Sequence, residues 1–139
     1  MIVDHLGIVV RSLEQAVELW ERAFGYEPMT LPVVNTRQKV RVVFLQKMGS
    51  PTIKLIEPTD ASSPVHALAG RGGGLHHLCF RCDDLDHELS RLQQIGGRIL
   101  AAPQPGEAFD GERIAFAYVG QGLNIELIET DKKAGLLLP

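Results

Sequence analysis

The strongest constraint on the fold of this chain is an internal repeat. A shift of 72 positions places DHLGIVVRSLEQ (4–15) on HHLCFRCDDLDH (76–87) and TIKLIEP (52–58) on NIELIET (124–130), with no gap between them. Repetition at a fixed offset indicates that one structural unit occurs twice. Each copy is too small to bury a good core by itself, so we expect the two copies to fold together as one domain.

Each copy is predicted to form a βαβββ unit. Ser12 and Asp84 are N-cap residue types that precede helical patterns, and glycines follow the ends of those patterns. The expected strands are 2–10, 28–34, 39–47 and 52–57 in the first copy, and 75–82, 98–102, 112–119 and 123–129 in the second.

These elements predict an α+β fold, with tandem βαβββ units forming a curved mixed sheet around a central cleft. We assign 1–58 to the first unit and 74–130 to the second. The linker 59–73 contains a short expected helix at 65–68, and the tail 131–139 is expected either to fray or to serve as a contact segment.

The composition excludes several classes of protein. Hydrophobic residues form 45% of the chain, charged residues 22%, and the formal net charge is −3. These values are typical of globular proteins and argue against a nucleic-acid or membrane partner. The first residues lack the basic segment of a signal peptide, so we expect a cytoplasmic protein. Cys79 and Cys82 lie in one predicted strand and should face opposite sides, which favours two reduced cysteines.

Alternation along the strands brings four polar side chains to the concave side of the sheet. His5 and Lys54 come from the first copy, and His77 and Glu126 occupy the equivalent positions in the second. Two imidazoles and a carboxylate are ligands of divalent ions, so we predict a site for Zn, Co, Mn or Ni made by His5, His77 and Glu126. His76 is the neighbouring alternative, but it pairs with Asp4 in the repeat and has the outward parity.

The motifs DHLGIVVRSLEQAVELW, IKLIEP, SSPVHALAGRGGGLHHLCF and NIELIE resemble the vicinal oxygen chelate superfamily, which includes glyoxalases, dioxygenases and antibiotic-resistance proteins. The resemblance extends from about residue 3 to 130 and is strongest to methylmalonyl-CoA epimerases. It implies a divalent metal between two units, with ligand positions at His5, Lys54, His77 and Glu126. It also implies a small-molecule substrate such as an acyl-CoA, and a homodimer.

Lys54 departs from the pattern of this superfamily, which has Glu, Gln or His at that position. An ammonium has no lone pair to offer a metal. Three alternatives follow: the other three residues hold the metal, or Lys54 is a neutral base, or the metal is lost and Lys54 pairs with Glu126. A second departure is the loop VVNTRQKVR, which lacks the carboxylate base that the epimerases carry there.

Arg41 and Arg113 are also equivalent in the repeat. Both are expected on the concave side, where a guanidinium could bind a substrate carboxylate or phosphate. The alternative is that each arginine forms a surface ion pair at the end of its strand.

The predicted activity is that of a metal-dependent isomerase or lyase that removes a proton alpha to a thioester carbonyl, with Glu126 or Lys54 as the catalytic group. Two alternatives remain at this point. One is a glyoxalase-like lyase, and the other is a metal-free protein of the same fold that binds a small molecule, as antibiotic-resistance proteins do.

Overall fold

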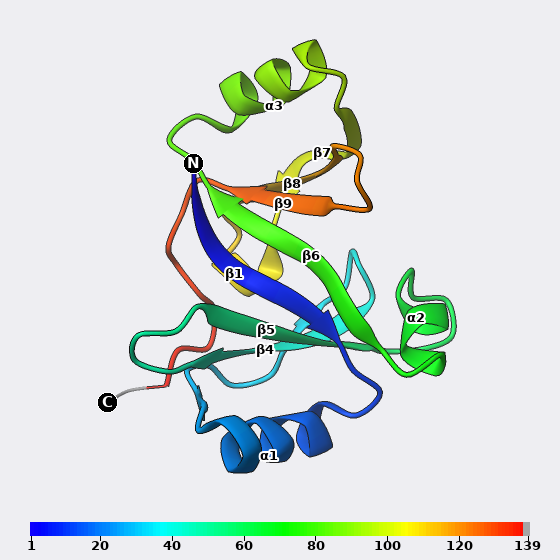
Figure 1. Ribbon diagram of the computed structural model, residues 1–139, viewed down its shortest axis with the longest axis vertical. Coiled ribbons are helices and arrows are strands. Elements are labelled where there is room, and N and C mark those ends of the chain that lie inside the picture. Colours follow the sequence, from blue (N-terminus) through cyan, green and yellow to red (C-terminus); the bar gives the residue numbers. More distant parts are fainter. Residues whose placement is uncertain (138–139) are drawn as a thin grey trace.

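The computed structural model describes residues 1–137 and contains two successive sets of strands and helices (Figure 1). The first unit contains β1 (Ile2–Val9), α1 (Leu13–Phe24), β2 (Glu27–Pro28), β3 (Val33–Asn35), β4 (Val40–Gln46) and β5 (Thr52–Pro58). The second contains β6 (Gly74–Arg81), α3 (Leu85–Gln94), β7 (Arg98–Pro105), β8 (Arg113–Tyr118) and β9 (Asn124–Ile128). Between β5 and β6 lies α2 (His66–Gly70), and a 3₁₀ turn, Glu107–Phe109, precedes β8.

One curved mixed sheet joins the two units. Its strand order is β2-β4-β5-β1-β6-β9-β8-β7, and β3 pairs with β4. The first strands of the two units, β1 and β6, are antiparallel neighbours at the centre. Each also pairs in parallel with the last strand of its own unit, β5 or β9. The predicted α+β fold is therefore confirmed, with α1 and α3 at opposite ends of the molecule (Figure 1).

The helices begin where the N-cap residues predict. The hydroxyl of Ser12 accepts a hydrogen bond from the backbone N–H of Gln15, and Asp84 accepts one from the N–H of His87. Helix α1 ends at Gly25, whose φ of 73° is in the left-handed region that glycine adopts without strain. Each helix packs on one outer face of the sheet through its own apolar cluster.

A third apolar cluster fills the concave side, where the units meet. It includes Phe44 and Ile56 from the first unit and Phe109, Ile114 and Ile128 from the second. Because both units supply it, neither half has this core alone. The polar side chains that point into the concave side are consequently surrounded by apolar groups and have little contact with water.

The region 28–34 differs from the sequence prediction. The single strand expected at 28–34 is divided into the short strands β2 and β3, and the residues between them pair with the tail. The backbone N–H of Leu31 donates to the carbonyl of Gly135, and the N–H of Leu137 donates to the carbonyl of Met29. The described part of the tail is thus a contact segment, and it runs from the second unit back to the first (Figure 1).

Gly7 lies opposite His77 in the central strand pair, which joins the two units. A Cβ atom added at Gly7 would meet the imidazole of His77, with both ring nitrogens at 2.6 Å. We therefore predict that Gly7→Ala lowers the free energy of unfolding by about 1–3 kcal/mol, because His77 or a strand must shift. Urea unfolding measures the change.

Gly70→Ala provides a matched control, because a Cβ at Gly70 would meet nothing within 4 Å. Its stability should stay within about 0.5 kcal/mol of the parent. Equal effects of the two substitutions would contradict the proposed close contact.

Candidate functional site

Four side chains from four strands meet at the centre of the concave side. His5 on β1, Lys54 on β5, His77 on β6 and Glu126 on β9 are each at most 3% exposed. The Nε2 atoms of His5 and His77 lie 3.0 and 3.1 Å from Oε1 of Glu126, and 3.3 Å from one another. The Nζ of Lys54 lies 3.6 Å from the same carboxylate oxygen. The structure thus brings together all four residues that strand alternation predicted.

The carboxylate of Glu126 is held by charge more than by hydrogen bonds. The neighbouring nitrogens are close to Oε1, but their geometry does not meet the criteria for a hydrogen bond. Neither oxygen of Glu126 therefore has a hydrogen-bond donor among the described residues. Burial by itself would raise the pKa of Glu126, but the Lys54 ammonium, together with His5 and His77, holds that pKa well below its usual value. Burial also lowers the pKa of His77 to about 4, so its imidazole is neutral at pH 7.

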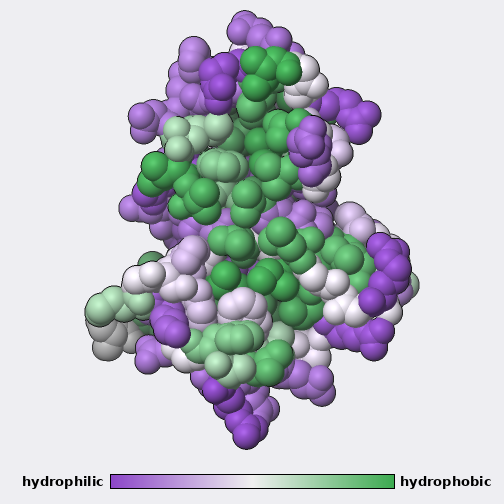
Figure 2. Space-filling model, viewed as in Figure 1, coloured by the Kyte–Doolittle hydropathy of each residue, from purple (hydrophilic) through white to green (hydrophobic). Residues whose placement is uncertain are grey.

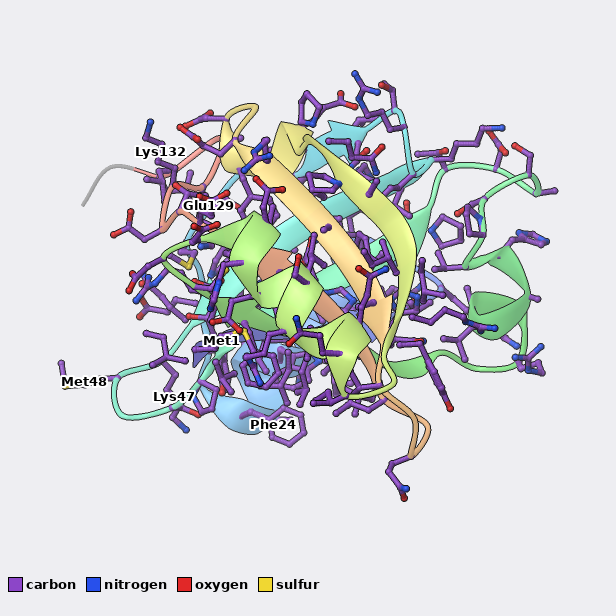
Figure 3. All side chains as sticks on the ribbon, turned by 90° about the horizontal axis from the view of Figure 1, so that it is seen from above. Met1, Phe24, Lys47, Met48, Glu129 and Lys132 are labelled. Atoms are coloured by element: carbon purple, nitrogen blue, oxygen red, sulfur yellow. The ribbon has the colours of Figure 1, made fainter. Side chains whose placement is uncertain are left out.

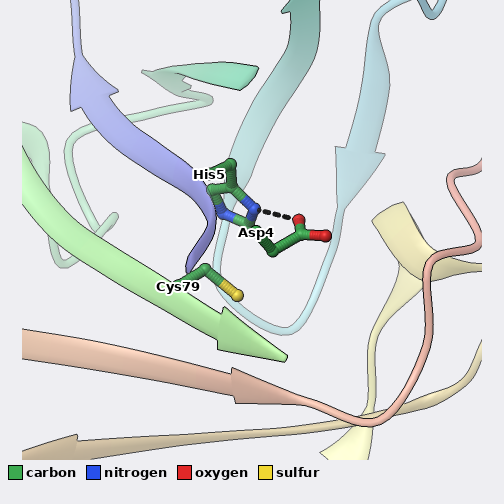
Figure 4. Close-up of side chains that lie close together, drawn as sticks. All are labelled: Asp4, His5 and Cys79. Atoms are coloured by element: carbon green, nitrogen blue, oxygen red, sulfur yellow. Dashed lines mark hydrogen bonds and ion pairs between the residues drawn. The ribbon is translucent and has the colours of Figure 1, made fainter. Parts of the chain in front are cut away.

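Two β-bulges provide each histidine with a further partner. The pairing of β1 with β6 skips Asp4 on one strand and His76 on the other, two positions that are equivalent in the repeat. The Nδ1 of His5 lies 2.7 Å from the Asp4 carboxylate (Figure 4), and the Nδ1 of His77 lies 2.8 Å from that of His76. The outward parity predicted for His76 is wrong, because the bulge interrupts the alternation.

Lys133, in the tail, completes the surroundings of Asp4. Its Nζ lies 3.2 Å from Oδ2 of Asp4, and the side chain is almost completely buried. Burial opposes ionisation of Asp4, but His5 and Lys133 outweigh it, so the pKa of Asp4 is lowered. Sequence reasoning missed this residue. The only signal was a lysine pair near the end of the chain, and its neighbour Lys132 lies at the periphery (Figure 3).

A cavity of about 290 Å³ adjoins the cluster on the side of His76. Its walls are mostly apolar, with Val42 and Ile56 from the first unit and Phe116 from the second. The polar side chains that line it are Gln38, Lys54, His76, His77 and Asn124. A mostly apolar pocket with a few convergent polar groups is typical of a small-molecule site.

Arg41 and Arg113 do not join this cluster. Each lies opposite a strand-end glutamate and contacts an acidic side chain of the helix in its own unit: Arg41 binds Glu57 and Glu14, and Arg113 binds Glu129 and Asp86. The concave placement expected for the two arginines is therefore wrong. Neighbouring valines of β4 occupy that side, so Arg41 faces α1.

Both cysteines are free, as the sequence predicted. Cys79 lies on the concave side beside Asp4 and His5 (Figure 4), and its Sγ is within 4.8 Å of their ligand atoms. Burial raises the pKa of the Cys79 thiol well above its usual value, which disfavours the thiolate that a metal would bind. Burial also raises the pKa of Cys82 to about 11.

The residues of the central cluster fit a divalent ion only in part. The ligand atoms of His5, His77 and Glu126 lie within 4.8 Å of one another, and they are of the types that Zn, Co, Mn and Ni bind. Lys54 fills the fourth converging position with an ammonium, which cannot act as a ligand. The set of four therefore does not fit a metal, and the predicted ion stays a prediction.

Comparison with known families assigns the chain to a superfamily. Residues 4–116 match the model of the Glyoxalase/Bleomycin resistance protein/Dioxygenase superfamily. The chain belongs to this superfamily. The match includes the strands that carry His5, Lys54 and His77, and it ends before β9. No helix in the described part of the chain is both long and apolar enough to cross a membrane.

Individual relatives and solved structures show which members of the superfamily this chain resembles. The chain is 36% identical to the uncharacterized protein YqjC of Bacillus subtilis over 91% of both chains. A crystal structure of methylmalonyl-CoA epimerase from Mycobacterium tuberculosis matches with a TM-score of 0.80 and 33% identity, over 91% of this chain and 86% of that one. A methylmalonyl-CoA epimerase in complex with methylmalonyl-CoA and NH4+ matches with a TM-score of 0.81 and 30% identity, over 95% and 96%.

Glu126→Gln should show how much the charge of this side chain contributes to the free energy of unfolding, because Gln has nearly the same shape without the charge. Because the pKa of Glu126 is lowered in the folded state, its ionisation stabilises the fold above about pH 4.5, and that stabilisation is lost as the pH falls through the folded pKa. We predict a loss of about 3–5 kcal/mol at neutral pH, since Lys54 remains buried without a partner. The loss should stay constant above about pH 4.5 and shrink below it, as the pH falls towards the lowered pKa of Glu126. Urea unfolding at several pH values measures it.

Glu129→Gln serves as the control, because Glu129 belongs to a partly exposed ion pair. It should cost no more than about 1 kcal/mol at any of these pH values. A loss for Glu126→Gln that does not change with pH would show that the carboxylate is not ionised in the folded protein.

Proposed function

We propose that this protein is an isomerase that removes and returns a proton alpha to the carbonyl of an acyl-CoA thioester, with methylmalonyl-CoA as the type of substrate. Its relatedness to methylmalonyl-CoA epimerases at 30–33% identity supports the reaction class. The observation that carries the proposal is the position of the buried charged cluster at one wall of an apolar cavity. A related lyase would begin with the same proton removal.

Lys54 is the residue of the cluster best placed to act on a substrate. It lines the cavity, whereas Glu126 is completely buried behind the wall. Proton removal alpha to a thioester leaves negative charge on the carbonyl oxygen, and an ammonium in an apolar site stabilises such charge. One related structure contains methylmalonyl-CoA together with NH4+, so an ammonium accompanies the substrate in that complex.

His76 is the side chain on the cavity wall that suits proton transfer. Burial and then the nearby Lys54 ammonium lower the pKa of His76, so the imidazole is neutral at pH 7 and has a nitrogen that can accept a proton. This position compensates for the missing carboxylate in the loop before β4. We propose that Glu126 acts by holding the charge of Lys54, and proton transfer through Glu126 itself stays a prediction.

Exchange of the α-proton tests the proposed activity. The purified protein, incubated with methylmalonyl-CoA in heavy water, should incorporate deuterium at the α-carbon, as followed by mass spectrometry. Lys54→Met should reduce the exchange rate at least about a hundredfold, because the charge that stabilises the enolate is removed. His87→Ala, on the exposed surface of α3, should leave the rate unchanged.

Two results would count against this proposal. Binding of methylmalonyl-CoA without any exchange would favour the alternative of a small-molecule binding protein. Exchange that is unaffected by Lys54→Met would place the reaction elsewhere in the chain.

We also propose a second copy of the chain as the partner. The outer face of the central strands carries apolar side chains that neither α1 nor α3 fully covers, and hydrophobic residues gather over the middle of the molecule in Figure 2. Leu6 and Leu78, which pair across β1 and β6, are both partly exposed there. Symmetric pairing of two such faces would bury them.

Leu78→Glu should convert the dimer to a monomer, because a carboxylate would be buried at the interface. Size-exclusion chromatography with light scattering measures the mass. Leu19→Glu is the matched control, since Leu19 is 57% exposed on α1, and it should leave the mass unchanged. A monomeric parent protein would refute the proposed interface.

A further inference from the structure

We propose that the ammonium group of Lys54 is the resident cation of this site, where it takes the place of a divalent metal ion and makes the site independent of metal. The role of this cation toward an enolate rests on the proposed function. Its exclusion of a metal does not, because that depends only on the positions and charges of the side chains. Four features of the structure support this assignment: the place of Lys54 in the repeat, the balance of buried charge, the aromatic surroundings and the access to the cavity.

Lys54 and Glu126 are equivalent residues of the two copies, on β5 and β9. The fold therefore directs both side chains to the same point, where a metal-binding site would need two ligands. In this chain one of them is a carboxylate and the other is its counter-ion, with 3.6 Å between Nζ and Oε1. No other lysine or arginine in the described part of the chain forms an ion pair with Glu126.

The buried charges balance without a metal. Glu126 is paired with Lys54, and Asp4 is paired with Lys133, so each of the two inner carboxylates has its own ammonium. A divalent ion at this point would add two positive charges and no negative one. Because an uncompensated charge in an apolar interior is strongly unfavourable, the ion would have to displace Lys54 before it could bind.

The aromatic rings around Lys54 suit an ammonium. Its Nζ lies 5.2 Å from the ring centroid of Phe109 and 5.8 Å from that of Phe44. Ring faces attract a cation at such distances. The Nζ of Lys133 lies 5.3 and 5.2 Å from the same two rings, so both buried lysines share one aromatic environment.

Lys54 also faces the substrate side of the cluster. It lines the apolar cavity, and its Nζ donates no hydrogen bond to any described residue. Its N–H groups are therefore available for an oxygen of a bound ligand. A substrate carboxylate, or a carbonyl oxygen that becomes negatively charged, would accept hydrogen bonds from these N–H groups. The oxygen would then occupy the place that it would have on a metal ion.

Metal binding tests this assignment without reference to activity. We expect the purified protein to contain no stoichiometric metal by mass spectrometry, and to show no saturable binding of Co²⁺ or Zn²⁺ by calorimetry. Lys54→Gln replaces the ammonium with an amide oxygen, which ends one bond closer to the backbone, and should bind one equivalent of either ion. We expect its affinity to exceed that of the parent at least tenfold.

Two further variants define the site of that binding. In the double variant Lys54→Gln, His77→Ala the gained ion should be lost, because a ligand is missing. Lys54→Met removes the charge without adding a ligand, so its affinity should fall between those of the parent and of Lys54→Gln. Circular dichroism checks that each variant is folded.

Tight stoichiometric binding of Co²⁺ or Zn²⁺ by the parent protein would overturn the assignment, and this measurement needs no variant. So would a folded Lys54→Gln that binds metal no better than the parent. Failure of the proposed function gives a different result: the parent binds no metal, Lys54→Gln gains it, and neither protein exchanges the α-proton of methylmalonyl-CoA. That result would support Lys54 as the resident cation and would refute the proposed isomerase function.

Discussion

The centre of this structure depends on the buried ion pair between the carboxylate of Glu126 and the ammonium of Lys54. Side chains from three other strands point at one oxygen of Glu126, so the relative register of β1, β5, β6 and β9 determines whether the cluster can form. A charge with no exposed surface needs a compensating charge, and Lys54 supplies it. This ion pair joins one residue of each unit, and it lies beside the apolar core that the two units share.

The repeat creates a symmetric frame, and the tail and the cavity make it asymmetric. Asp4 and His76 are equivalent bulge residues, each beside the Nδ1 of a central histidine. On the side of Asp4, the tail inserts Lys133 and closes the interior. On the side of His76, the interior opens into the cavity. Of the two equivalent positions, the one occupied by His76 lines the cavity.

The alternation of strand residues was sufficient to predict the central cluster. His5, Lys54, His77 and Glu126 all meet as expected, because the period of two is a local property of extended backbone and the repeat supplies the equivalent positions. The same reasoning was wrong for Arg41 and Arg113. In β4 and β8 the neighbours on both faces are apolar, so the sequence pattern does not indicate which face is concave.

Short-range patterns and the repeat were enough to predict the two units, the helix starts, the free cysteines and the four residues of the charged cluster. The positions of Asp4, His76 and Lys133 beside the cluster, in contrast, follow from the folded structure alone. A bulge exists only relative to the partner strand, and the position of Lys133 depends on the path of the tail from the second unit to the first. These features are contacts between segments far apart in the chain, which no local pattern records.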